Sequence, residues 1–270
     1  MKFEYEATGD QERRTDHIIQ ELGGDLIRAT FNEHDLLVQR EAAEVSVSGK
    51  LMESLQNTSE LFAYIDEPVP TVQDLMEHGL DIRKLTQHFE AMQAGGDDPQ
   101  IILAPAFELS EWERLFQSVY YNNPAVTSYI DILHNLGANP QIAAPFVDSW
   151  KNLPTNTVKL RPETEYHRGH QWSLRLVPSL SDHNLSEGHF DSINIRDHLS
   201  IAEYLTIHAF GLITGGEPPR SRIWLNTAFV QNLAVYGEWH PDAQTIFISD
   251  TARDVSLLVV PSVSDLRKPS

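Results

Sequence analysis

The chain has 270 residues, of which 41% are hydrophobic and 22% are charged, and it contains no cysteine. This length suits one large domain or two smaller ones, and the lack of cysteine excludes a disulfide framework and cysteine metal sites. No apolar run is long enough to span a bilayer, and residues 1–10 lack the basic and apolar regions of a signal peptide. The sequence therefore predicts a cytoplasmic protein with no membrane partner.

The net charge of −19 is concentrated in the first half of the chain. Residues 1–150 hold 26 of the 39 acidic residues but only 9 of the 20 basic ones. Duplex nucleic acid is not expected as a partner, because neutralising phosphates needs clustered Lys and Arg. The charge indicates either a solvated acidic surface, which is the commoner case, or a surface that binds a basic protein partner.

The first half is predicted to be mostly helical, on the basis of apolar periodicity and capping residues. Thr71 and Ser110 are typical residues for the start of a helix, and Pro124 suits the first helical position. The predicted helices cover residues 10–22, 32–38, 48–55, 71–78, 81–94, 110–120 and 124–133. Short strands are predicted at residues 61–65 and 100–104.

Residues 151–156, with the sequence Lys-Asn-Leu-Pro-Thr-Asn, are the predicted linker. The predicted domains are therefore residues 1–150, a helical acidic region with short strands, and residues 157–270, an α+β sheet domain. The second region begins with predicted strands at 157–160 and 172–177. The polar, unpatterned residues 178–197 are predicted to form a long loop, and long loops in compact domains are often functional.

A buried helix is predicted from Ser200 to Gly215. Ser200 and Glu203 fit a capping box, Gly215 provides a stop, and the residues between are apolar around almost the whole circumference, which is typical of a central packed helix. Strands are predicted after it at 233–239, 244–249 and 255–260. The predicted fold class is α+β, with a helical acidic N-terminal part and a C-terminal mixed or antiparallel sheet packed on this helix. The predicted shared core consists of Leu205, Leu212, Trp224, Val235, Ile246 and Leu257.

The common catalytic motifs do not occur in this sequence. It has no phosphate-binding glycine-lysine loop, no dinucleotide-binding glycine pattern, no Gly-x-Ser-x-Gly elbow and no His-Glu-x-x-His helix. The sequence therefore leaves open whether the protein is an enzyme and which residues would be catalytic, and it predicts no cofactor-binding residue and no cofactor.

Six of the twelve histidines lie between residues 167 and 208. Imidazoles and carboxylates can bind zinc, manganese or iron, or act as a base with its orienting partner. The spacing fits no known motif, and Gly169 together with the strand predicted at 172–177 argues against a helical turn that would join the first two histidines. The candidate residues are His167, His170, Asp182, His183, His189 and Asp191. We predict that no three of these side chains converge and that they form no metal site.

Four segments of the second half resemble segments of uncharacterised proteins of Saccharibacteria and related small bacteria. The segments are Ile201–Leu205, Gly216–Pro219, Ile223–Asn226 and Gly237–Asp242. Those proteins typically end in a glycine-arginine stretch, where this chain has residues 257–262. The resemblance covers about residues 200–260 and implies neither an activity nor any functional residue.

Two functional hypotheses follow from these observations. The missing motifs and the uneven charge favour a non-enzymatic intracellular binding or interaction protein, with a protein as its partner. The alternative is a metal-dependent hydrolase or lyase that uses His167, His170, His183, His189 and Asp191. The sequence specifies neither a substrate nor an oligomeric state.

Overall fold

The computed structural model of the chain describes residues 43–44, 46–135, 150–151, 153, 158–162, 169–178, 185–192, 194–215, 221–228, 233–260, 263 and 265–268. The chain divides into two units, residues 1–46 and 47–270. Only three residues of the first unit are described, so the architecture is that of the second unit. The helices predicted at 10–22 and 32–38 lie outside the described residues.

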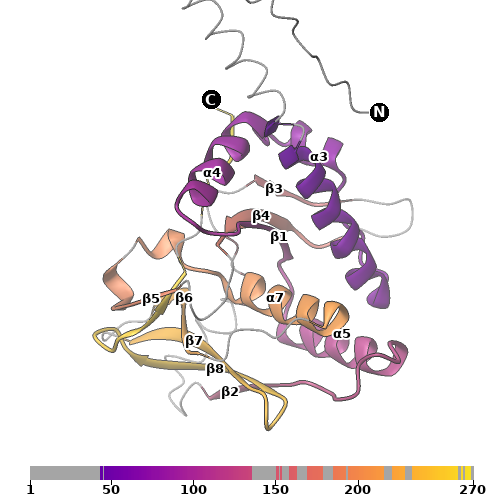
Figure 1. Cartoon of the computed structure of the whole chain (residues 1–270). Helices are drawn as coiled ribbons and strands as arrows, with labels where there is room; N and C mark the ends of the chain where they lie inside the picture. Colours follow the sequence, from indigo (N-terminus) through magenta and orange to yellow (C-terminus); the bar gives the residue numbers. More distant parts are fainter. Residues whose placement is uncertain are drawn as a thin grey trace, which may run out of the picture. The chain divides into compact units, whose positions relative to one another are not determined.

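The protein has an α+β fold, and its described strands form two sheets (Figure 1). The smaller sheet is antiparallel, and the larger is mixed because β2 runs parallel to β8, and β6 to β9. The smaller sheet has the order β1 (Gln100–Pro105), β4 (Trp172–Val177), β3 (Val158–Leu160). The larger has the order β2 (Asp131–Asn135), β8 (Thr245–Ala252), β7 (Leu233–His240), β6 (Ile223–Ala228), β9 (Leu257–Val259), β5 (Ser186–Gly188).

Helix α7 (Ile201–Thr214) lies between the two sheets, where it contacts β1 and β6 (Figure 1). The Ser200 hydroxyl accepts a hydrogen bond from the Glu203 N–H, and the Glu203 carboxylate accepts one from the Ser200 N–H. Gly215 ends the helix in the left-handed region, at φ 72°. The first turns are buried all round, so the capping box, the glycine stop and the central position are all confirmed.

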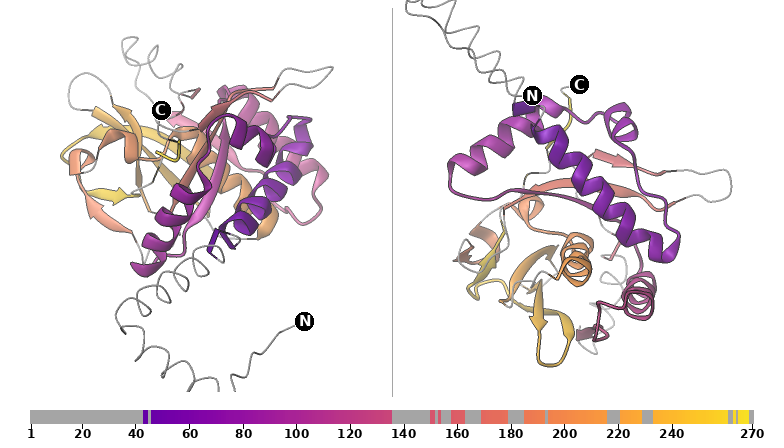
Figure 2. Two further views of the ribbon diagram at one scale, coloured as in Figure 1. Left: turned by 90° about the horizontal axis from the view of Figure 1, so that it is seen from above. Right: turned by 45° about the vertical axis from the view of Figure 1, so that its right-hand side comes forward.

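The remaining helices lie around the smaller sheet and α7 (Figures 1 and 2). Residues 47–62 are helical and continue into the 3₁₀ helix η1 (Ala63–Ile65). They are followed by α3 (Val72–Glu77), which contacts β3, and α4 (Ile82–Ala94), which contacts β4. Helix α5 (Leu109–Asn122) contacts η1, α7 and β2. Among the described residues, no helix is long and apolar enough to cross a membrane.

The buried side chains form two clusters instead of one. Leu205, Val235 and Ile246 belong to the large cluster, whereas Trp224 and Leu257 belong to a small one with Phe190, Ala234 and Val259. Successive side chains of a strand point to opposite faces, so Ile223 and Leu225 enter the large cluster while Trp224 faces the other way. Leu212 is only partly buried. The predicted single core is therefore wrong for Leu212, Trp224 and Leu257.

Four predicted elements differ from the structure. Residues 61–65 are the end of a helix and η1, not a strand, and residues 124–133 lead into β2 instead of forming a helix. Helix α5 begins one residue before Ser110, because Glu108 and Glu111 form the capping box. Within residues 178–197, β5 and the 3₁₀ helices η2 (Phe190–Ser192) and η3 (Ile195–Asp197) replace part of the predicted loop.

Strand pairing crosses the predicted linker at residues 151–156. Strand β1 pairs with β4, and β2 pairs with β8, so each sheet contains strands from both sides of that segment. The compact units of the chain divide after residue 46. The pairing joins described residues on the two sides of the predicted linker, and the predicted domains 1–150 and 157–270 stay a prediction.

Candidate functional site

The structure describes three of the six candidate site residues, His170, His189 and Asp191. His167, Asp182 and His183 lie outside the described residues. His189 is exposed, and Asp191 forms an ion pair with Arg253. Within the part of the chain that the structure describes, no three His, Asp or Glu side chains are placed to hold a metal ion. That no three of the six side chains converge stays a prediction, because three of them lie outside the described residues.

His170 is held between two carboxylates from different elements. Its Nδ1 lies 3.0 Å from Glu67 Oε2, and its Nε2 lies 2.8 Å from Glu111 Oε1. Its backbone N–H also donates to Glu67 Oε1 at 2.7 Å. Gly169 permits this approach, because a Cβ there would lie 2.6 Å from Pro68 Cγ and 3.1 Å from the Glu67 carboxylate. We call the side chains of His170, Glu67 and Glu111 the His170 clamp.

The geometry of the clamp specifies the protonation state of the imidazole. An ionised carboxylate can only accept hydrogen bonds, so two carboxylates facing both ring nitrogens require a proton on each nitrogen. The hydrogen bond to Glu67, with the charges of Glu67 and Glu111, raises the pKa of His170 above its ordinary 6.5, although burial opposes this. Both nitrogens are directed at carboxylates, so the described geometry favours a structural clamp over a metal ligand.

A buried ion pair joins β4 to the start of α7. Arg175 Nε lies 2.9 Å from Glu203 Oε1, and both side chains are fully buried. The guanidinium also donates to the carbonyl oxygens of His198 and Arg196, at 2.8 and 3.0 Å. These bonds compensate the charge in the interior. Arg175 was not predicted to be a site residue, although it is the one charged residue of the strand predicted at 172–177.

Two histidines of the predicted cluster region are buried in the core. The imidazole of His198 donates from Nε2 to the carbonyl oxygen of Phe190 at 2.8 Å, and burial lowers its pKa. Neither ring nitrogen of His208 has a hydrogen-bond partner among the described residues. Burial lowers the pKa of His208 to about 3, so its ring is neutral beside Tyr204 and Trp239.

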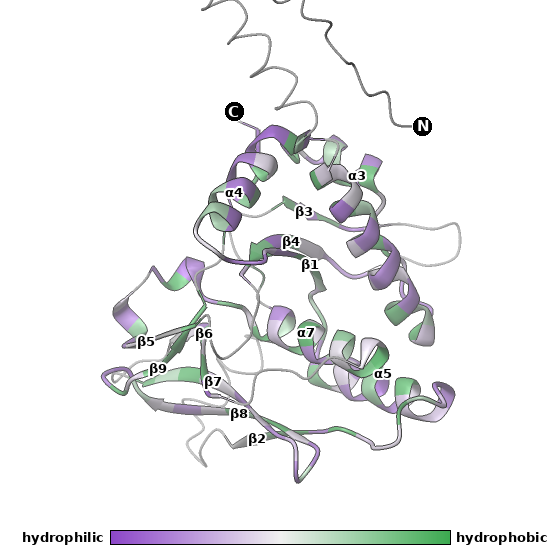
Figure 3. Cartoon of the chain, in the orientation of Figure 1, coloured by the Kyte–Doolittle hydropathy of each residue, from purple (hydrophilic) through white to green (hydrophobic). Residues whose placement is uncertain are grey.

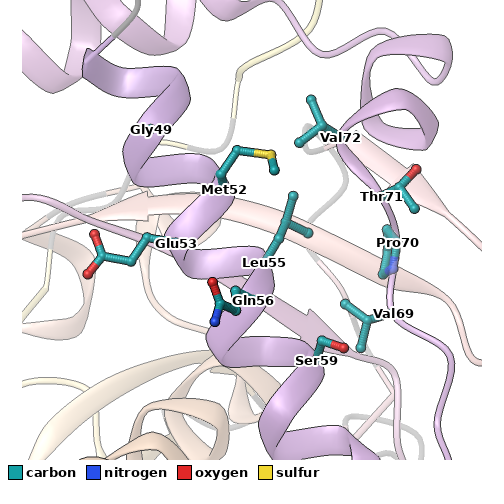
Figure 4. A pocket seen from close by; sticks show the side chains of 10 residues that line it. All are labelled: Gly49, Met52, Glu53, Leu55, Gln56, Ser59, Val69, Pro70, Thr71 and Val72. Carbon is teal, nitrogen blue, oxygen red and sulfur yellow. The ribbon is translucent and has the colours of Figure 1, made fainter.

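A groove of about 570 Å³ runs between the helix of residues 47–62 and the extended segment that leads into α3 (Figure 4). Met52 and Leu55 point from the helix toward this segment, while Glu53 points to the outer side of the helix (Figure 4). Met52 is 58% exposed, although it is apolar. The groove is lined by Gly49, Met52, Glu53, Leu55, Gln56, Ser59, Val69, Pro70, Thr71 and Val72.

The groove has an apolar centre and polar edges. Met52, Leu55, Val69 and Val72 supply the centre, and the polar lining residues are Glu53, Gln56, Ser59 and Thr71. Figure 3 colours the hydrophilic positions of the chain purple. Among the described residues, neither the N–H nor the carbonyl of Val69 has a hydrogen-bond partner. The groove therefore has an apolar surface, and one residue of its wall, Val69, has main-chain groups without a partner among the described residues.

Comparison with models of protein families, with curated protein sequences and with solved structures gives no match to this chain. The resemblance of residues 200–260 to proteins of small bacteria therefore stays a prediction.

Proposed function

We propose that the protein is a non-enzymatic binding protein that takes up a segment of a partner protein in the groove between residues 47–62 and 69–72. The observation that carries this proposal is the exposed Met52 in an apolar groove of about 570 Å³. Binding sites in proteins are typically hollows of about 300–1,000 Å³ with apolar walls and a few polar groups.

Several features favour a peptide segment over a small molecule. The groove is formed by a helix and an extended stretch of chain, and the free main-chain groups of Val69 suit pairing with another backbone. Methionine is common at surfaces that bind peptides, because its flexible thioether adapts to different side chains. The groove residues include no histidine and no arrangement of nucleophile and base, which agrees with a binding role.

The test is a peptide-display selection on the full chain, followed by binding measurements on synthetic peptides. Enriched peptides should bind the wild type and lose about tenfold or more in affinity when Met52→Asn removes the apolar contact. Met76→Asn is the matched control, since Met76 is 43% exposed but does not line the groove. A selection that yields no peptide whose binding depends on Met52 would refute the proposal.

A further inference from the structure

We infer that the segment bound in the groove is basic as well as apolar, with Lys or Arg side chains beside the residue that contacts Met52. The inference rests on the proposed function and adds the chemical class of the partner. It follows from the charges on the two elements that form the groove, compared with the few cations available to neutralise them.

The chain segment that forms the groove carries an excess of negative charge, and one of its carboxylates, Glu53, lines the groove. Residues 47–77 contain six carboxylates and a single Lys or Arg, Lys50. Lys50 lies 3.4 Å from Glu53 in an exposed pair, which is the kind of pair that contributes little energy. The six carboxylates are Glu53, Glu60, Asp66, Glu67, Asp74 and Glu77.

Three of these six carboxylates, Glu60, Asp66 and Glu77, form no ion pair with a Lys or Arg of the described residues. Glu60 and Glu77 instead accept hydrogen bonds from neutral glutamine amides one helical turn away. A basic partner would therefore gain charge pairs without displacing an existing cation.

Two of the acidic groups lie at the edge of the groove. Glu53 is one of its lining residues, although its carboxylate points to the outer side of the helix, and Asp74 accepts a hydrogen bond at 2.7 Å from the hydroxyl of Thr71, which also lines the groove. The hydrogen bonds from Thr71 lower the pKa of Asp74, so this carboxylate stays ionised. Complementary charge around an apolar contact directs association and excludes partners of the wrong sign. A second copy of this chain, with its net charge of −19, is the wrong sign.

The experiment uses three peptides with the same apolar residues, in which the alternating positions are all Lys, all Gln or all Glu. Each is titrated against the full chain at low and at high ionic strength. The Lys peptide should bind about tenfold or more tightly than the Gln peptide, the Glu peptide should bind most weakly, and added salt should reduce the differences.

Two variants connect the effect to the groove. Glu53→Gln with Glu60→Gln should weaken binding of the Lys peptide by about threefold to tenfold, whereas Glu187→Gln, an exposed position on β5, should leave it unchanged. Met52→Asn should weaken all three peptides.

The outcomes separate this inference from the proposed function. Equal binding of all three peptides through Met52 would leave the proposed function intact and overturn the inference. Failure of every peptide to bind would overturn both. A dimer that depends on Met52, observed by sedimentation, would make a second copy the occupant and would also overturn the inference.

Discussion

The imidazole of His170 connects two parts of the chain that are distant in sequence, since Glu67 follows η1 and Glu111 lies in α5. The Glu67 side chain is only 1% exposed and also accepts the His170 backbone N–H. Glu111 is more exposed and already caps α5 through the Glu108 N–H. When the ring loses its proton, the bond to Glu111 is therefore the one that we expect to break.

This clamp predicts that stability decreases as the pH rises through the folded pKa of His170, which lies above 6.5. The pKa of His170 is raised in the folded protein above its ordinary 6.5, so its stabilising contribution is complete below 6.5 and is lost as the pH rises through the folded value. Urea unfolding at a series of pH values should show this decrease, and the NMR titration of His170 should have its midpoint above 6.5.

The variant His170→Asn should remove that part of the pH dependence, because asparagine does not titrate. His189→Asn is the control at an exposed histidine and should keep the wild-type profile. The other charged groups near the ring are Glu108 and its ion-pair partner Lys151. An NMR midpoint at or below 6.5 would contradict the assignment of an imidazolium.

The unpaired ring of His208 predicts the opposite behaviour on the acid side. Its pKa falls from 6.5 to about 3 on burial, so stability is complete above pH 6.5 and decreases as the pH falls toward the folded value. Because both ring nitrogens lack partners among the described residues, His208→Met should raise the free energy of unfolding by about 1–3 kcal/mol at neutral pH.

Thermal and urea unfolding of His208→Met at pH values from neutral to acid measure both effects. The loss of stability on acidification should be smaller in the variant than in the wild type. A variant that is less stable than the wild type at neutral pH would show that the ring nitrogens do have partners in solution.

At the scale of elements, β4 and α7 are connected by the Arg175–Glu203 pair in the interior. Removal of one partner leaves the other charge buried without compensation. Arg175→Met should therefore lower the free energy of unfolding by about 3–5 kcal/mol. The double variant Arg175→Met with Glu203→Gln should lose less free energy of unfolding than the two single variants lose in sum. A double-mutant cycle by urea unfolding measures this coupling.

The exposed pair of Lys84 and Asp265, 2.7 Å apart, is the control for this cycle. Lys84→Met should cost less than about 1 kcal/mol, as is usual for exposed pairs. Additive losses for Arg175→Met and Glu203→Gln would show that the two groups do not interact in solution.

The elements that local signals specify were predictable from the sequence, and those that depend on distant partners were not. Helix α7 follows from Ser200, Glu203 and Gly215, which act within the helix itself. Residues 124–133 were predicted to be a helix because Pro124 suits a helix start, yet β2 forms there because β8 provides a parallel partner more than a hundred residues later. Periodicity over a short window contains no information about that pairing.

The same limit applies to the site. His170 was singled out from its neighbours in sequence, but Glu67 and Glu111 were not, because only the tertiary structure brings them to it. Met52 and Leu55 lie within the helix predicted at residues 48–55. The groove forms because the segment at Val69 lies opposite these two side chains. This packing is tertiary, and no local sequence pattern describes it.

For the whole molecule, the acidic charge of −19 predicts repulsion of other polyanions. The full chain should not shift duplex DNA in a gel at low salt, where non-specific contacts typically give micromolar binding. Salt-sensitive binding in that range would overturn this prediction and would point to a basic surface outside the described residues.

The crossed strand pairing has a consequence for synthesis on the ribosome. Asp131 of β2 pairs with Thr245 of β8, and Gln100 of β1 pairs with Val177 of β4. Strands β1 and β2 therefore leave the exit tunnel long before their partners have been translated. Because unpaired edges of strands promote aggregation, we expect nascent chains stalled before residue 172 to depend on ribosome-associated chaperones, and chains released after residue 260 to be much less dependent on them.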